Sequence, residues 1–103
     1  MHIVVLITAV DKKQAAKIAR ALVQRKLVAC VNVIDRVSSM FWWKGSVDTA
    51  VEVLMLAKST RAKLPRIAAL VKSMHSYEVP EIIALPVVGG NRDYLDWIDE
   101  SIR

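Results

Sequence analysis

The 103-residue chain is poor in cysteine, glycine and proline, with one, three and three of them, and it lacks a long hydrophobic run. The single cysteine, Cys30, excludes an internal disulfide framework and is compatible with a reducing compartment. Apolar stretches such as 3–7 and 82–88 fall far short of the roughly 20 residues that a membrane helix requires. The N-terminus lacks the basic region, apolar core and cleavage site of a signal peptide. We therefore expect a cytoplasmic protein with no membrane partner.

The common enzyme signatures are also absent. The sequence contains no glycine-rich phosphate loop, no Gly-x-Ser-x-Gly motif and no His-Glu-x-x-His motif. An acylphosphatase-like activity would want a phosphate-binding loop after the first strand, and segment 8–11 offers neither glycine nor arginine. No Cys-x-x-Cys motif or neighbouring Cys/His pair supports a metal site within one chain. We predict a protein that is not an enzyme.

The balance of charge is basic, with a net charge of +5 and an isoelectric point of about 9.7, which raises the question of nucleic-acid binding. The basic residues are spread along segments 12–26 and 61–72 at spacings typical of the solvated face of an amphipathic helix. They form no cluster interleaved with aromatic residues, and no RNA-recognition signature is present. We expect no nucleic-acid partner.

Apolar residues recur in patterns that predict regular secondary structure. Segment 2–8 reads as a short buried strand, and Asp11 can cap a helix whose apolar stripe continues through about Arg25. Segment 28–58 reads as two long strands joined in a hairpin. Gly45 lies at the junction of these strands, where glycine allows a positive φ angle in a tight turn.

The second half of the chain again alternates helix and strand. Hydroxyl groups at 59–60 are expected to cap a second helix, with Pro65 in its first turn. A polar loop follows at 75–81, then a strand at 82–88 and a short final helix. The order β-α-β-β-α-β plus a C-terminal helix is the split βαβ pattern of the ferredoxin-like α+β fold. We expect one domain spanning residues 1–103, with both helices on one face of a four-stranded antiparallel sheet.

The predicted hairpin is apolar on both of its faces. Successive side chains of a strand point to opposite faces, yet apolar residues occupy neighbouring positions through much of 28–34 and 51–57. A small domain has one core and covers one face of its sheet from within. The other face then needs a partner, and two or three copies packed with closed symmetry would bury it. The hairpin therefore predicts a homo-oligomer.

Five side chains stand out as candidates for chemistry. Cys30 lies in an apolar strand, where free cysteine is usually a small core residue and a metal or redox role is the alternative. His75 ends a helix, where it can cap free carbonyls or act as a ligand. Glu81 is either a buried acid or a solvated strand entrance. Glu52 and Lys58 are charged positions on an apolar strand face, and they need a partner or a pocket between subunits.

Five blocks of sequence stand out: Ala-Cys-Val-Asn at 29–32, Ser-Met-Phe-Trp-Trp-Lys-Gly at 39–45, Lys-Ser-Thr at 58–60, His-Ser-Tyr-Glu-Val-Pro-Glu-Ile at 75–82 and Gly-Asn-Arg-Asp-Tyr-Leu-Asp-Trp at 90–97. In their order and spacing these blocks resemble the CutA divalent-cation tolerance proteins, and the similarity covers nearly the whole chain. The resemblance implies a ferredoxin-like homotrimer built by the long hairpin strands, and tolerance of copper and other divalent metals. Two departures from the family pattern are Phe41, where tyrosine is frequent, and Ser76, where proline is usual.

The resemblance favours a trimeric, non-enzymatic protein of metal homeostasis in the cytoplasm. Such a protein would bind copper or other divalent cations in or near the clefts between subunits. Cys30 and His75 are the best soft ligands available, and Glu81 or Glu52 can supply oxygen.

The resemblance also suggests kinship with the trimeric PII signalling proteins, which hold ligands in the clefts between subunits. A second hypothesis is therefore a PII-like module that binds a small anionic ligand or nucleotide. Lys58 and nearby arginines would be the counter-charges of such a ligand, and Trp43 and Tyr77, carried over from the family pattern, are the other candidate residues of the cleft. A third interpretation is a structural trimer whose stability helps to assemble other proteins.

Overall fold

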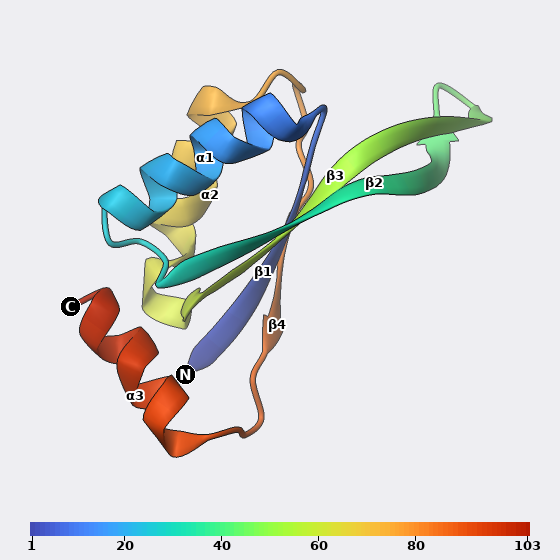
Figure 1. The fold of residues 1–103 in the computed structure, drawn as a ribbon. Helices are drawn as coiled ribbons and strands as arrows, with labels where there is room; N and C mark the ends of the chain where they lie inside the picture. The colour runs from blue at the N-terminus through green and yellow to red at the C-terminus, as the bar shows by residue number, and fades with distance from the viewer.

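A four-stranded antiparallel sheet forms the centre of the computed structural model, which describes residues 1–103 (Figure 1). The elements in chain order are β1 (His2–Ala9), α1 (Lys12–Gln24), β2 (Cys30–Trp43), β3 (Ser46–Thr60), a 3-10 turn (Arg61–Lys63), α2 (Leu64–Met74), β4 (Ile82–Pro86) and α3 (Arg92–Ser101). The strands lie in the order β2-β3-β1-β4, and every pairing is antiparallel. The predicted α+β order βαββαβ with a C-terminal helix is confirmed. No helix is both long and apolar enough to cross a membrane.

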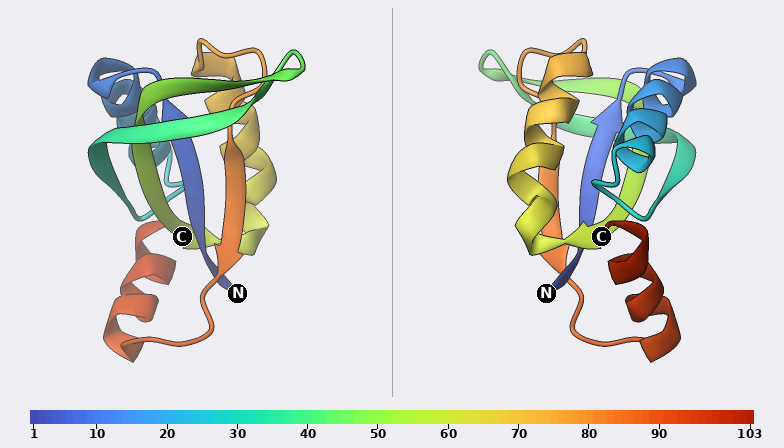
Figure 2. Two further views of the ribbon diagram at one scale, coloured as in Figure 1. Left: turned by 90° about the vertical axis from the view of Figure 1, so that its right-hand side faces the viewer. Right: turned by 90° about the vertical axis from the view of Figure 1, so that its left-hand side faces the viewer.

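One face of the sheet carries the main hydrophobic core. Helices α1 and α2 lie side by side on this face, in front of the strands in the right panel of Figure 2. Alternate residues of β1 point toward them, as the period of two in a strand requires. The fully buried side chains of this core include Val5, Ile7, Ile18, Leu22, Met55, Ile67 and Val71.

The opposite face of the sheet is also apolar, and no helix covers its middle. The register places Leu6 opposite Leu56 and Ile83, and Leu54 opposite Ile34, so these side chains share one face. About half of the Ile83 surface is exposed (51%), and Ile34 is 43% exposed. The hairpin is thus apolar on both faces, as the sequence predicts. We call the uncovered side the open face.

The β2–β3 hairpin extends well beyond the helices, and it gives the molecule its long dimension of 44 Å (Figure 1). Its tip turns at Lys44 and Gly45, whose φ angles of 49° and 82° are both positive, as in the tight turns that suit a twisted hairpin. A bulge interrupts the pairing between Ile34 and Val37. There Arg36 adopts a φ of 63°, which is unusual for a residue with a side chain.

The start of α1 confirms the prediction for Asp11, whose Oδ1 accepts the Gln14 amide at 2.8 Å. Pro65 lies in the first turn of α2, also as predicted. The expectation that the hydroxyls at 59–60 cap α2 is wrong. Strand β3 continues through Thr60, which forms no side-chain cap, and Ser59 is fully buried and donates its hydroxyl to the Leu27 carbonyl at 2.6 Å.

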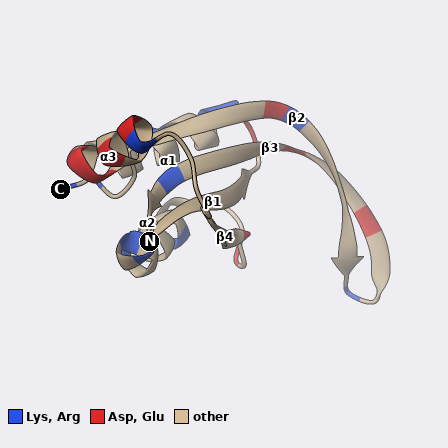
Figure 3. Cartoon of the chain, turned by 90° about the horizontal axis from the view of Figure 1, so that it is seen from below, with Lys and Arg blue, Asp and Glu red and all other residues tan.

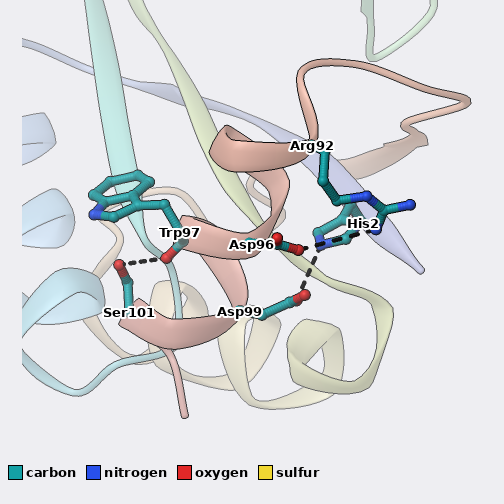
Figure 4. A network of polar contacts seen from close by, with 6 residues as sticks. All are labelled: His2, Arg92, Asp96, Trp97, Asp99 and Ser101. Atoms are coloured by element: carbon teal, nitrogen blue, oxygen red, sulfur yellow. Dashed lines mark hydrogen bonds and ion pairs between the residues drawn. The ribbon is translucent and has the colours of Figure 1, made fainter.

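Helix α3 packs against the end of the sheet near the N-terminus. Ile98 and Ile102 are buried against Ala29, and His2 Nε2 lies 3.0 Å from Asp99 Oδ1 (Figure 4). This helix carries four acidic residues and one basic residue within a chain of net charge +5. Figure 3 shows these acidic residues on α3 and basic residues on the α2 side of the molecule.

Candidate functional site

The 75–81 loop is held to the sheet through His75, the residue that follows α2. Its Nε2 lies 2.7 Å from the Thr8 carbonyl, and its Nδ1 accepts the Tyr77 amide at 3.0 Å. A carbonyl can only accept and an amide N–H can only donate, so these contacts specify the neutral ring with its proton on Nε2. Both ring nitrogens of His75 are therefore in use, and a metal ion would have to displace one contact.

Tyr77 extends the same network to Glu52 on β3. Its hydroxyl donates to Glu52 Oε2 at 2.9 Å, and the two rings of His75 and Tyr77 lie 4.7 Å apart. Glu52 is only 8% exposed, and no cationic side chain lies within 4.0 Å of it. Burial, together with the hydrogen bond to Glu52 and the charge of that carboxylate, raises the pKa of Tyr77 above its usual value.

A second group of polar side chains surrounds Cys30 at the start of β2. Cys30 pairs directly with Lys58 across the strands, so both side chains lie on the open face. The Cys30 Sγ lies 3.4 Å from the Tyr94 hydroxyl of α3, and either atom can donate. The hydrogen bond to Cys30, followed by burial and the charge of the thiolate, raises the pKa of Tyr94.

The predicted metal ligands do not meet within one chain. His75 contacts Thr8, whereas Cys30 lies beside Lys58, whose partner on β1 is Val4. Val4 and Thr8 lie four positions apart on β1, which corresponds to about 13 Å along the strand. Glu81 is exposed just before β4, so it is a solvated strand entrance. No group of three metal-binding side chains occurs in the chain.

The residues proposed for a cleft ligand are also spread out. Tyr77 reaches β3 at Glu52, which lies six residues before Lys58 on that strand. Trp43 is at the hairpin tip, 54% exposed, with Lys44 Nζ 5.7 Å from the centre of its ring. A ligand that touches all three residues would need side chains from more than one copy.

Three contacts of this region were not anticipated from the sequence, and one of them is the hydrogen bond from Tyr77 to Glu52. The others are the contact of His75 Nε2 with the Thr8 carbonyl and the contact of the Tyr94 hydroxyl with Cys30 Sγ, 64 residues away along the chain. Tyr94 belongs to the block at 90–97 that carries part of the family resemblance, so its position in that block could have marked it. A backbone carbonyl leaves no such signal, because every residue has one.

The chain closely matches known proteins over its full length. The profile of a family described as CutA1 divalent ion tolerance protein matches residues 3–101. The divalent-cation tolerance protein CutA of Thermus thermophilus is 46% identical over 101 residues, and the match covers 98% of each chain. The rice protein CutA 1, chloroplastic, is 41% identical over 101 residues, and this chain spans 57% of its length.

A solved structure shows the same architecture. The periplasmic divalent cation tolerance protein CutA from Archaeoglobus fulgidus superposes with a TM-score of 0.97, at 41% identity, and the match covers both chains completely. None of these three names states an enzymatic activity. The relatives include proteins named as chloroplastic and periplasmic, so they do not share one compartment.

Proposed function

The chain belongs to the CutA1 divalent ion tolerance family, and from this premise we propose that it is a non-enzymatic homotrimer of metal homeostasis that binds copper or another divalent cation. The observation that carries the proposal is the match over residues 3–101, together with relatives at 41–46% identity that are named for cation tolerance. We place its action in the cytoplasm, where a reducing environment keeps the single Cys30 a free thiol.

Assembly through the open face and the hairpin supports this proposal. Ile83 and Leu85 are each 51% exposed, and at the hairpin tip Met40 and Trp42 are each 76% exposed. Exposed apolar surface of this extent marks an interaction site. Burying it stabilises an oligomer by about 25 cal/mol per Å² of apolar area removed from water.

A metal site in this protein would be shared between copies, because one chain does not bring the donors together. Cys30 offers a soft sulfur on the open face, where a second copy would pack. His75 offers nitrogen at the other end of the sheet, and Glu81 is an exposed carboxylate next to the loop. Two copies packed face to face could bring a thiol and an imidazole within reach of one ion.

Calorimetry of the assembled protein with Cu²⁺ and Zn²⁺ tests these ligands, with Zn²⁺ included because copper can oxidise a thiol. The double variant Cys30→Ala/His75→Ala is expected to lose bound metal, while His2→Asn, which removes the only other histidine, keeps the wild-type stoichiometry. Unchanged stoichiometry in the double variant would show that these ligands are wrong. So would a loss of bound metal in the His2→Asn variant. Light scattering on each variant reports the trimer separately.

A second candidate function rests on Lys58. Its side chain lies on the open face with no carboxylate within 4.0 Å, so it is a half-buried cation without a counter-charge. A PII-like module that binds a small anionic ligand or nucleotide between subunits would supply that charge. Trp43 and Tyr77 would complete such a cleft from neighbouring copies.

A thermal-shift screen of nucleotides and small acids, run beside divalent metals, separates the two functions. Stabilisation by metal alone supports the first function. Stabilisation by a nucleotide or acid that disappears in Lys58→Gln supports the second function, and no shift from any anion rejects it.

A further inference from the structure

The outward side of helices α1 and α2 carries most of the positive charge of the chain. Segments 12–26 and 61–74, which contain the two helices and the turns beside them, hold ten of the fifteen basic residues and none of the ten acidic ones. Nine of these ten side chains are exposed, and the tenth, Lys63, is half-buried. None forms a salt bridge, since the two ion pairs of the chain both involve α3. We call this surface the basic layer.

The basic layer is continuous, although its two segments are separated in the sequence. Helices α1 and α2 lie side by side and run in opposite directions (Figure 2). At one end Met74 of α2 lines the same depression as Lys13 of α1. At the other end the Ser59 hydroxyl donates to the Leu27 carbonyl, which brings the end of the first segment close to the start of the second. The open face is on the other side of the sheet, so assembly through it leaves the basic layer exposed.

The stability of the helices does not account for this charge. Lys12 and Lys13 occupy the first turn of α1, where the helix dipole favours acidic side chains. Lys13 and Lys17 lie one helical turn apart, and like charges at this spacing slightly destabilise a helix. A soluble surface usually mixes both signs of charge. A large surface of one sign is instead typical of a protein that binds a polyanion.

The composition of the basic layer distinguishes between classes of polyanion. Neither helix contains an aromatic residue, so the bases of a single strand would have nothing to stack on. Val23 and Met74 are the only large apolar side chains exposed in the two segments, too few to insert into a lipid bilayer. A second copy of the chain is repelled, because each copy has a net charge of +5. The phosphate backbone of a duplex requires neither stacking nor insertion, since cations on an open surface neutralise it.

We propose that the basic layer binds double-stranded nucleic acid through the phosphate backbone, without reading its sequence. Helix α1, with 13 residues, is about 20 Å long, a distance over which a duplex presents several phosphates. No nucleic-acid partner is expected from the sequence, because each basic segment by itself is typical of a solvated helix face. The fold joins the two segments in one surface, which changes that expectation. The proposal is independent of metal binding and of any ligand on the open face.

Fluorescence anisotropy of a labelled DNA duplex of mixed sequence measures binding to the full-length assembled protein. At about 50 mM salt we expect a dissociation constant between roughly 1 and 100 μM that does not depend on the sequence of the duplex. Contacts with about five phosphates predict that the logarithm of the association constant falls with the logarithm of the salt concentration with a slope of about −4 to −5. The absence of saturable binding at protein concentrations up to roughly 200 μM overturns the proposal.

Two double variants locate the binding. Arg20→Gln/Arg66→Gln removes one exposed cation of the basic layer from each helix. Its affinity should fall at least roughly tenfold, and its salt slope should become less steep by about two, because two phosphate contacts are lost. The matched control, Arg92→Gln/Arg103→Gln, removes the same charge outside the basic layer and should keep the wild-type slope and an affinity within about threefold. Light scattering checks that each variant assembles as wild type does.

Three results overturn the proposal even if the duplex binds. One is an equal loss of affinity in the two double variants, which would assign binding to net charge and not to the basic layer. Another is a single strand that binds more tightly than the duplex. The third is tighter binding of phosphatidylserine vesicles or of poly-L-glutamate than of the duplex, which would identify a membrane or an acidic protein as the partner.

Discussion

Replacing Tyr77 with phenylalanine removes the single hydroxyl that ties the 75–81 loop to β3. The hydroxyl donates to Glu52 Oε2 at 2.9 Å, and Glu52 is 8% exposed with no cation within 4.0 Å. A hydrogen bond to a charged group contributes about 1.5–3 kcal/mol, and a buried acceptor left unpaired bears its desolvation penalty. We therefore expect Tyr77→Phe to lower the free energy of unfolding by about 2 kcal/mol.

Denaturant titration at one fixed protein concentration measures this change, because assembly makes stability depend on concentration. Tyr94→Phe is the matched control. Its hydroxyl meets the Cys30 thiol at 3.4 Å in an exposed setting, so its loss should cost no more than about 0.5 kcal/mol.

A double-mutant cycle with Glu52→Gln separates the charge from the contact. Glutamine keeps an acceptor but removes the charge, so Tyr77→Phe should cost only about 1 kcal/mol in that background, as for a neutral hydrogen bond. Equal costs of Tyr77→Phe in both backgrounds would refute the role given to the buried charge. A cost no larger than that of Tyr94→Phe would refute the contact itself.

Two further predictions concern the hairpin tip and alkaline pH. Gly45→Ala should destabilise the protein by about 1 kcal/mol in denaturant titration, because Gly45 has a φ of 82° with open space around it. Gly89→Ala, where φ is not positive, is the control and should change stability little. Equal effects of the two substitutions would contradict the backbone argument. Burial and Glu52 raise the pKa of Tyr77, and the bond to Cys30 raises that of Tyr94, so the unfolded chain ionises first and stability should fall as pH rises above about 10. The decline should be smaller in the variant that carries phenylalanine at both positions, and an equal decline would show that other groups cause it.

The periodicity of the sequence was sufficient to predict the fold. The helical stripe after Asp11, the alternation along the hairpin and the glycine at its tip correspond to α1, β2–β3 and the turn at Gly45. The error at 59–60 has a physical cause. Ser59 and Thr60 are good capping residues, but β1 begins opposite Thr60, and pairing with β1 includes both residues in β3.

The site was less predictable than the fold, because its contacts join residues that no local pattern connects. A charged residue on an apolar strand face pointed to Glu52, and composition pointed to the 75–81 loop, but nothing in the sequence indicated that Tyr77 joins them. The bulge at Arg36, where φ is 63°, also left no signal, since arginine is not typical of a positive φ to the degree that glycine is.

We expect the open face to link assembly to ligand binding. Lys58 and Cys30 lie on it beside Leu56, so any copy that packs there to bury the leucine also removes water from the lysine. A cation deprived of water needs a negative charge, which a carboxylate of the neighbour or a bound anion must supply. A ligand that supplied this charge would bind the assembled form better than the separated chains and would strengthen assembly by mass action. Assembly and ligand affinity are therefore expected to change together, and a substitution at Lys58 should alter both.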